Sequence, residues 1–200
     1  TLRHFISALD PNTYLPLYLT GNINSSAELY KRILTGLLID PPFSPTKAKS
    51  LYFKAIAELS KKPVVIIDDA QDVRDNALLD LKSMINFDQD SKNRITFVLV
   101  GQPELREKLS YALFASIRQR IKLNIALKGL SLEETCAYID HQLKICGRPH
   151  SIFSDNSKGE IFKRSEGVAR VINRICFKAL IIGAIEKLDV IDSKDVPAND

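Results

Sequence analysis

The stretch "VVIIDD" at residues 64–69 constrains the fold more than any other part of the sequence. Four β-branched apolar residues, Val64 to Ile67, run directly into two adjacent carboxylates, Asp68 and Asp69. An unbroken apolar run of this kind is typical of a strand buried on both faces of a parallel sheet. Ligands of such sheets bind beyond the carboxyl ends of the strands, where these two acids lie. The stretch therefore predicts an α/β fold with a ligand site at residues 68 and 69.

The rest of the chain divides into an alternating part and a helical part. Strands are expected at residues 14–20, 64–68, 95–101 and 121–127, with helices before and between them. Pro16 favours an edge position for the first strand, because proline cannot donate to a sheet ladder. From residue 131 onward the pattern is entirely helical. We therefore expect a three-layer αβα core with a parallel sheet over residues 1–127, and a small helical lid subdomain over residues 128–200.

Composition excludes several classes of protein. The 200 residues are 45% hydrophobic and 26% charged, which is ordinary for a globular domain. No apolar run approaches the roughly 18 residues that cross a membrane, and no secretory signal pattern is visible. The three cysteines are too scattered for a disulfide framework or a metal site, so we expect a reducing, cytoplasmic location. A net charge of +4 neither demands nor excludes a DNA partner.

A cation shared between the protein and a polyanion explains two adjacent carboxylates at the end of a buried strand. In phosphoryl transfer one acid holds Mg²⁺, and a neighbouring polar or acidic group orients the attacking water. The alternative is that Asp68 and Asp69 cap the next helix. Asp72 and Asp75 are better placed for capping, so the metal hypothesis is favoured.

Four segments, in register, resemble the AAA+ ATPases, and more narrowly the ExeA-type group, which includes ATPases associated with transposases. "VVIIDDAQ" is similar to the Walker B motif, and "LVGQPELREKL" to the sensor 1 strand and loop. "IRQRIKLNIALKGLSLEETCAYIDHQL" resembles the arginine-finger segment and the entry to the lid. "SEGVARVINRICFKALIIGA" resembles the sensor 2 helix. The resemblance implies a P-loop NTPase-type fold, ATP and Mg²⁺ as cofactors, and self-association into a ring or filament.

The resemblance also implies roles for the two acids and the sensor 1 residue. Asp68 would hold Mg²⁺ through water, and Gln102 would touch the γ-phosphate or the attacking water. Asp69 stands where the family usually has a glutamate that polarises this water. Aspartate is one methylene, about 1.5 Å, shorter, and misplacement by about 1 Å can cost on the order of a hundredfold in rate. We therefore expect slow hydrolysis. The alternative for Gln102 is a turn residue before Pro103.

Arginines of the last two segments have roles by the same resemblance. Arg120, with Arg118 in reserve, would be the finger that reaches the ATP of a neighbouring subunit. Its alternative is a surface arginine at the end of a helix. Gly167 and Arg170 match sensor 2, in which the arginine reaches the phosphates. Arg174 and Lys178 share the helix face of Arg170, and a solvated basic stripe is the favoured interpretation for them.

The P-loop of such ATPases, G-x-x-x-x-G-K-[ST], does not occur in the sequence, because none of the eight glycines is followed by lysine. The resemblance places this motif just before Thr1, and the strand that leads into it between residues 95–101 and 121–127. A start without methionine is typical of a piece of a longer chain. We expect the 200 residues alone to bind ATP weakly or not at all.

Two biological roles are open. One is a DNA-transposition helper that assembles on double-stranded DNA and recruits or activates a transposase. The other is the ATPase of a general (type II) secretion pathway that drives secretin assembly. "NFDQDSKN" and "VINRICFKALIIGA" resemble the compact, transposon-linked members of the group and so favour the first role. In that role Lys122, Lys128, Arg174 and Lys178 would contact phosphates. A degenerate nucleotide-sensing module is a third possibility, supported by Asp69 and the absent P-loop.

Overall fold

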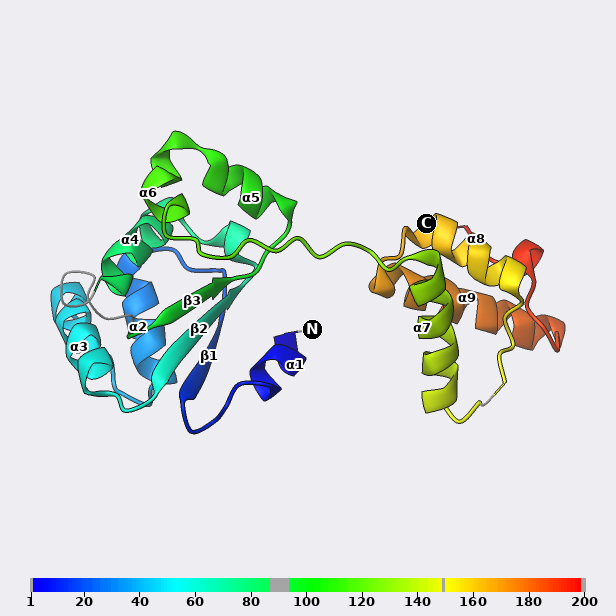
Figure 1. Cartoon of the computed structure of the whole chain (residues 1–200), viewed down its shortest axis with the longest axis horizontal. Coiled ribbons are helices and arrows are strands. Elements are labelled where there is room, and N and C mark those ends of the chain that lie inside the picture. Colours follow the sequence, from blue (N-terminus) through cyan, green and yellow to red (C-terminus); the bar gives the residue numbers. More distant parts are fainter. Residues whose placement is uncertain (1, 87–93, 149, 199–200) are drawn as a thin grey trace. The chain divides into compact units, whose positions relative to one another are not determined.

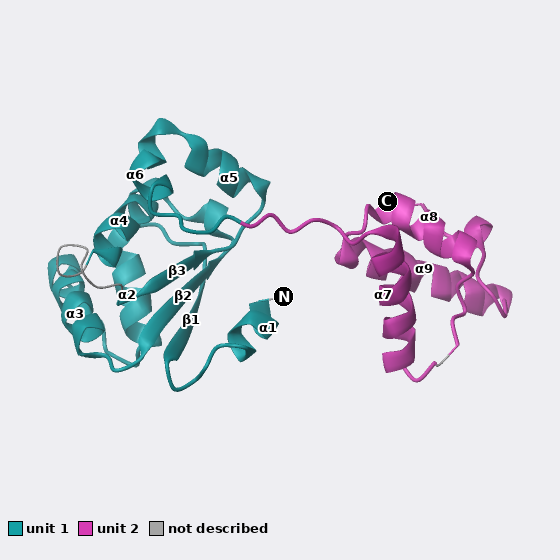
Figure 2. Ribbon diagram, viewed as in Figure 1, with its two compact units in different colours: residues 1–124 teal, residues 125–200 magenta. Residues whose placement is uncertain are grey.

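The computed structural model describes residues 2–86, 94–148 and 150–198 (Figure 1). The chain forms two compact units, Thr1–Asn124 and Ile125–Asp200 (Figure 2). Sequence patterns placed this boundary after residue 127. Most of the segment "NFDQDSKN" lies outside the described residues, so nothing here bears on its resemblance to transposon-linked ATPases.

Unit 1 alternates strands and helices, as the sequence predicted. Its elements in chain order are α1 (Leu2–Ser7), β1 (Tyr14–Thr20), α2 (Ser26–Gly36), α3 (Pro45–Glu58), β2 (Lys62–Asp68), the 3₁₀ turn η1 (Ala70–Asp72), α4 (Asp75–Ile85), β3 (Thr96–Leu99), α5 (Pro103–Ser110), the 3₁₀ turn η2 (Ala112–Phe114) and α6 (Ala115–Arg118). Helix α2 is capped by Ser25, because its side chain accepts a hydrogen bond from the N–H of Glu28.

The described strands form one parallel sheet in the order β1-β2-β3 (Figure 1). β1 lies at one edge, where Pro16 predicted it. In the central strand β2, Val65 and Ile67 pack into the core formed with α2, α3 and α4, and Ile66 is also fully buried although it points to the opposite face. Burial of each such side chain contributes about 1.5–3 kcal/mol. The prediction that "VVII" is a central strand covered on both faces is confirmed.

The strand predicted at residues 121–127 is wrong. This segment has no regular secondary structure, and its alternating apolar side chains are exposed, with Leu123 at 74% and Leu127 at 76%. The predicted order places another strand between β3 and this segment, and no described residue occupies that position. Without a neighbouring ladder the backbone groups of residues 121–127 cannot pair, so the alternating pattern alone does not produce a strand.

Unit 2 is helical, with α7 (Leu132–Ile145), α8 (Asp155–Ser165), α9 (Ala169–Glu186) and the 3₁₀ turn η3 (Ser193–Asp195). A capping box begins α7, because Ser131 and Glu134 accept each other's backbone N–H. A separate core forms between the helices, with Ile161 and Ile172 fully buried. An ion pair of 2.8 Å between Lys158 and Asp140 joins α8 to α7.

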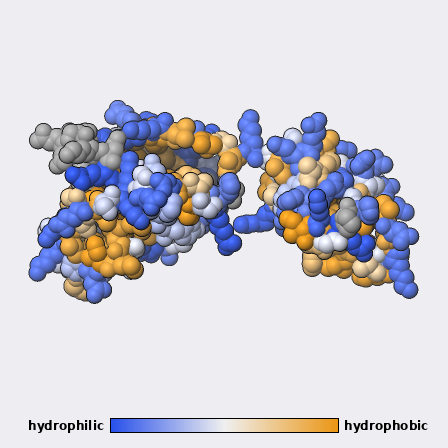
Figure 3. Space-filling model, turned by 60° about the horizontal axis from the view of Figure 1, so that its bottom comes forward, coloured by the Kyte–Doolittle hydropathy of each residue, from blue (hydrophilic) through white to orange (hydrophobic). Residues whose placement is uncertain are grey.

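Both units expose some apolar surface on the face seen in Figure 3. On α9, the exposed side chains of Phe177, Ile181 and Ile185 continue the helix face that begins with Arg170 and Arg174. Among the described residues, no helix is both long and apolar enough to cross a membrane.

Candidate functional site

The candidate site lies at the edge of the sheet where the three strands end. Parallel pairing places Thr20 opposite Asp68, and Ile67 opposite Leu99. The segments that follow β1, β2 and β3 therefore meet at one edge, as in open parallel sheets that bind ligands there. The polar side chains gathered at this edge are Tyr18, Asp68, Asp69, Gln71 and Gln102.

Asp68 is held through both of its carboxylate oxygens. The hydroxyl of Tyr18 donates a hydrogen bond of 2.7 Å to Oδ2, and the backbone N–H of Asp69 donates one of 3.1 Å to Oδ1. The hydrogen bond to the carboxylate raises the pKa of the Tyr18 phenol, because the phenolate would lose this partner and face a like charge. Neither Asp68 nor Asp69 caps the following turn with its side chain, so the capping alternative finds no support.

Asp69 has a left-handed backbone, with φ 52° and ψ 42°. Such a conformation costs a non-glycine residue about 1–2 kcal/mol, and aspartate is among the residues that adopt it most readily. Strained residues concentrate at functional sites, where the surrounding structure maintains them. The turn places the Asp69 side chain in solvent at the sheet edge, where a ligand could reach it.

Gln71 connects Asp69 to the loop that follows β3. Its Nε2 donates a hydrogen bond of 3.3 Å to Oδ1 of Asp69, and its Oε1 accepts one of 3.2 Å from the backbone N–H of Gln102. The loop can approach this closely because Gly101 has no side chain, since a Cβ there would lie 2.6 Å from Oε1 of Gln71. A single amide therefore links the second acid to the predicted sensor 1 loop.

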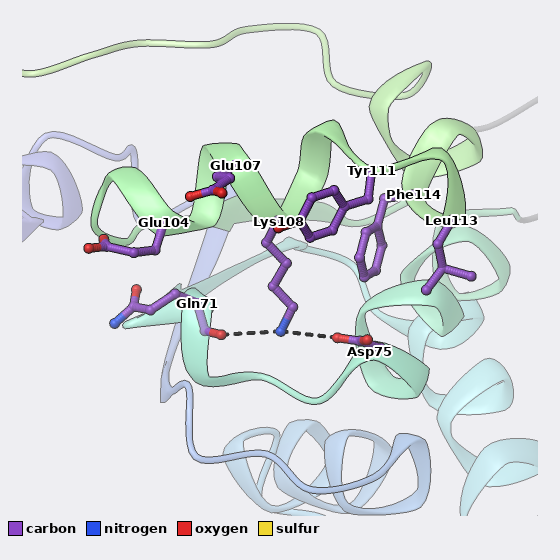
Figure 4. A pocket seen from close by; sticks show the side chains of 8 residues that line it. All are labelled: Gln71, Asp75, Glu104, Glu107, Lys108, Tyr111, Leu113 and Phe114. Atoms are coloured by element: carbon purple, nitrogen blue, oxygen red, sulfur yellow. Dashed lines mark hydrogen bonds and ion pairs between the residues drawn. The ribbon is translucent and has the colours of Figure 1, made fainter.

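Lys108 fastens the η1 turn to α5. Its Nζ donates to the carbonyl oxygen of Val73 at 2.6 Å. It also donates to the carbonyl oxygen of Gln71 at 3.2 Å and pairs with Asp75 at 3.2 Å (Figure 4). The hollow around it has a volume of about 360 Å³. Its lining residues are Gln71, Asp75, Glu104, Glu107, Lys108, Tyr111, Leu113 and Phe114. Neither Asp68 nor Asp69 lines this hollow. We therefore assign it to the contacts that hold η1 against α5, and not to the ligand site.

The structure brings together three of the residues predicted for the site, Asp68, Asp69 and Gln102. Gln102 is the N-cap residue of α5, immediately before Pro103, and its side chain is exposed. Its position satisfies both interpretations offered for it, the turn residue and the sensor. Gln102 stays a prediction as a catalytic residue.

The two arginines predicted as fingers lie elsewhere in unit 1. Arg120 is half-buried and donates to the Ser116 carbonyl oxygen at 3.4 Å and to Oδ1 of Asn86 at 3.3 Å. Arg118 donates to carbonyl oxygens at the end of α5, including that of Leu109 at 2.7 Å. Both arginines therefore already donate to carbonyl oxygens at the end of a helix, and the finger role of Arg120, with Arg118 in reserve, stays a prediction.

Gly167 and Arg170 belong to unit 2. Gly167 has φ +74°, and a Cβ on it would lie 2.0 Å from the carbonyl oxygen of Leu130. Its own carbonyl oxygen accepts a hydrogen bond of 2.9 Å from the Leu130 N–H. Arg170 is exposed in the first turn of α9. The geometry thus gives Gly167 a packing role within unit 2, and the proposed phosphate contact of Arg170 stays a prediction.

Two site residues, Tyr18 and Gln71, were missed by reasoning from the sequence. Tyr18 is an exposed tyrosine two residues from the end of β1, and it reaches Asp68 only through the parallel register of β1 and β2. Gln71 is the one amide in the turn that directly follows the two acids. Both signals lie in the sequence, but they become meaningful only once strand order and register are known.

The donor set at the sheet edge fits Mg²⁺ that arrives with a phosphate ligand. Mg²⁺ prefers oxygen donors, and it usually takes one or two carboxylates together with phosphate oxygens and water. Asp68 and Asp69 are such carboxylates. Among the described residues, no three His, Cys, Asp or Glu side chains gather into a metal-binding group, so a cage built from the protein alone does not occur in this part of the chain.

Comparison with known families decides the classification. A family model described as "AAA domain" matches residues 1–109, which is more than half of the chain. The chain belongs to this family. The matched region of the AAA domain contains all three strands and the residues Asp68, Asp69 and Gln102.

One curated relative of this AAA domain is General secretion pathway protein A of Aeromonas hydrophila, which is 35% identical over 121 residues. The match covers 60% of the chain and 22% of that protein, so the chain spans about a fifth of its relative. The similarity supports the ExeA-like resemblance inferred from the sequence.

Solved structures share the fold. Cdc6p from Pyrobaculum aerophilum matches with a TM-score of 0.69 and 17% identity, over 92% of this chain and 51% of that one. The Aeropyrum pernix ORC2 protein in its ADP form matches with a TM-score of 0.59 and 12% identity, over 96% and 53%. The RuvB Holliday junction branch migration motor of Thermotoga maritima matches with a TM-score of 0.53 and 19% identity, over 92% and 59%. These likenesses confirm the AAA+ type of α/β fold, and this chain spans about half of each structure.

Proposed function

We propose that this AAA+ chain is the Walker B and sensor 1 part of an ATPase that hydrolyses ATP as an oligomer. The observation that carries the proposal is the row of hydrogen bonds at the sheet edge, in which Gln71 links Asp69 to the loop of Gln102. Asp68 and Asp69 are the only two adjacent aspartates in the sequence, and they stand at the end of a buried central strand.

Each residue at this edge has a defined task in the proposed reaction. Asp68 would hold Mg²⁺ through water, and the ion would supply positive charge to the phosphates. Asp69 accepts a hydrogen bond from the attacking water, and this contact directs a lone pair of the water oxygen toward the γ-phosphate. Gln102 donates its side-chain amide to the same phosphate or water. Arg120 of a neighbouring copy supplies positive charge to the transition state, which makes hydrolysis depend on assembly.

Phosphate release by the longest native protein that carries these 200 residues tests the proposal. Asp69→Asn removes the negative charge that orients the water, and we expect turnover to fall by about 100-fold. Asp68→Asn is expected to raise the Mg²⁺ concentration needed for half-maximal turnover. The matched control is Asp72→Asn, in the exposed last position of η1. Equal turnover for the Asp69 and Asp72 variants would remove the basis of the proposal.

For the biological role, the relative named General secretion pathway protein A supports a secretion-linked ATPase. The sequence resemblance on which the transposition helper rested includes a segment outside the described residues, and no relative described above carries such a role in its name. We therefore place the secretion role, with a secretin as the assembly driven by ATP, before the transposition role.

One observation keeps the DNA-dependent role as a second candidate. Lys122, Lys128 and Arg174 are all exposed, as residues that contact a DNA backbone must be. Duplex DNA binding by the oligomer with ATP should then weaken by roughly 0.9 log units per log unit of salt for each phosphate contact. Lys122→Glu together with Lys128→Glu should reduce this slope by about two contacts. If the oligomer does not bind DNA, or if its DNA binding does not depend on salt concentration, the DNA-dependent role is rejected and only the secretion role remains.

A further inference from the structure

We propose that Tyr18 is a positioning residue for Asp68, and that its hydroxyl holds the carboxylate in the orientation that receives a divalent cation. The inference rests on the ATPase function proposed above. It extends the site to β1, a strand that contributes to none of the four motifs on which the family resemblance was based.

The contact joins two strands that are far apart in sequence. Tyr18 and Asp68 are separated by 50 residues, and the oxygen atoms of the two side chains lie 2.7 Å apart. In the parallel register Tyr18 pairs with Ile66, two positions before Asp68 and on the same face of the sheet. The long side chain of tyrosine covers this offset. A hydrogen bond to a carboxylate is shorter and roughly twice as strong as one between neutral groups.

The same contact determines which oxygen lone pairs of Asp68 stay available. An ionised carboxylate has about four acceptor sites. Tyr18 occupies one on Oδ2, and the Asp69 N–H occupies one on Oδ1. The terminal torsion of aspartate is otherwise broad, so a donor on each oxygen restricts rotation of the group. The remaining sites then point in fixed directions, as the ligands of a metal site do when outer partners orient them.

Packing does not account for a tyrosine at this position. Tyr18 is 52% exposed, whereas Leu17 beside it is buried in the core at 5% exposure. The hydroxyl contact with Asp68 is thus the feature that distinguishes Tyr18 from a phenylalanine. A competing arrangement would have the same hydroxyl occupy the place of the cation, and removal of the hydroxyl would then strengthen cation binding. The two arrangements predict opposite signs.

Mn²⁺ binding tests the inference without ATP turnover. It is measured from the loss of the free-ion electron paramagnetic resonance signal, on the longest native protein that carries these residues, saturated with a non-hydrolysable ATP analogue and freed of unbound nucleotide. Tyr18→Phe should weaken Mn²⁺ binding by about 10-fold, and the melting temperature should change little because the ring is retained. The matched control is Tyr14→Phe on the same strand, whose hydroxyl has no hydrogen-bond partner among the described residues. In ATP turnover, Tyr18→Phe should raise the half-saturating Mg²⁺ concentration by about 10-fold and leave kcat at saturating Mg²⁺ nearly unchanged.

The outcomes separate this inference from the function on which it rests. Unchanged or tighter Mn²⁺ binding by the Tyr18→Phe chain would overturn the positioning role, and so would a lower melting temperature with unchanged Mn²⁺ affinity. Asp68→Asn serves as the reference. If Asp68→Asn leaves Mn²⁺ binding unaltered, then Asp68 binds no cation, and both the proposed site and the inference fail. If only Asp68→Asn weakens binding, the ATPase site stands and the role of Tyr18 is rejected.

Discussion

Gly21 lies so close to Asp69 that a Cβ atom on it would sit 1.9 Å from the carbonyl oxygen of Asp69. The loop after β1 therefore passes directly against the backbone of the second acid. Since Asp69 is already left-handed, this backbone has little freedom to move away. Gly21, which follows β1, thus limits where Asp68 and Asp69 can lie at the end of β2.

Gly21→Ala should displace the turn that contains Asp68 and Asp69. Inserting a methyl group into a site without room typically costs about 1–3 kcal/mol, so both the melting temperature and the rate of ATP turnover should fall. Gly36→Ala is the control, because its Cβ would meet only the flexible side chain of Leu17, at 3.3 Å. Thermal unfolding followed by circular dichroism and a phosphate-release assay measure the two effects. An unperturbed Gly21→Ala chain would contradict the close approach.

Asp69→Glu should increase turnover. The longer side chain extends the carboxylate by about 1.5 Å, which brings it to the place that the family's glutamate occupies, and corrections of this size can be worth up to about 100-fold. The hydrogen bond from Gln71 to Asp69 would need to adjust. Asp72→Glu, with the same change on the exposed side of η1, should leave turnover unaltered. A rate for Asp69→Glu at or below that of the native protein would contradict the assigned role.

Arg120→Ala should abolish assembly-dependent turnover but leave nucleotide binding intact. The hydrogen bonds that Arg120 donates to Asn86 and Ser116, at 3.3 and 3.4 Å, are long. Loss of an arginine finger costs about 1,000-fold or more in rate. Mixing Arg120→Ala chains with Asp69→Asn chains should restore part of the activity, because each pair of neighbours can form one complete site. Arg118→Ala is the control, and it should lower stability rather than turnover. A mixture that stays inactive would contradict action in trans.

Local patterns predicted the elements whose stability is local. The β-branched run of β2 and the edge position indicated by Pro16 each depend on a few adjacent residues, and both are observed in the structure. The meeting of the strand ends also followed from the α/β pattern, because parallel strands end at a common edge. The position of Asp68 at this edge was therefore predicted from the sequence, whereas its role stays a prediction.

The features that the sequence did not predict depend on partners distant along the chain. Alternation at residues 121–127 matches a strand, yet a strand exists only where a neighbour supplies hydrogen bonds. Tyr18 meets Asp68 through a register that no local pattern specifies. Gln71 meets Gln102 because Gly101 leaves room for the approach. In each case the sequence does not say which distant residue or strand lies next to the residue in space. The local preference of the residue for helix or strand does not supply this information.

Gly167→Ala and Gly159→Ala should have opposite effects on unit 2. Gly167 combines a left-handed backbone with a Cβ position only 2.0 Å from the Leu130 carbonyl oxygen, so alanine there strains the backbone and separates the entry to α7 from the start of α9. We expect a loss of about 1–3 kcal/mol. Gly159 lies within α8, and no atom lies within 4 Å of its Cβ position.

Alanine at position 159 should therefore stabilise α8 by about 0.8–1 kcal/mol, which is the difference in helix propensity between the two residues. Hydrogen exchange of amides in α8 and α9 measures both changes within unit 2, apart from the stability of unit 1. Faster exchange is expected for Gly167→Ala and slower exchange for Gly159→Ala. If Gly167→Ala exchanged as slowly as the native chain, then the close backbone contact with Leu130 would not contribute to the fold, and a direct role at the nucleotide would become the better explanation for this glycine.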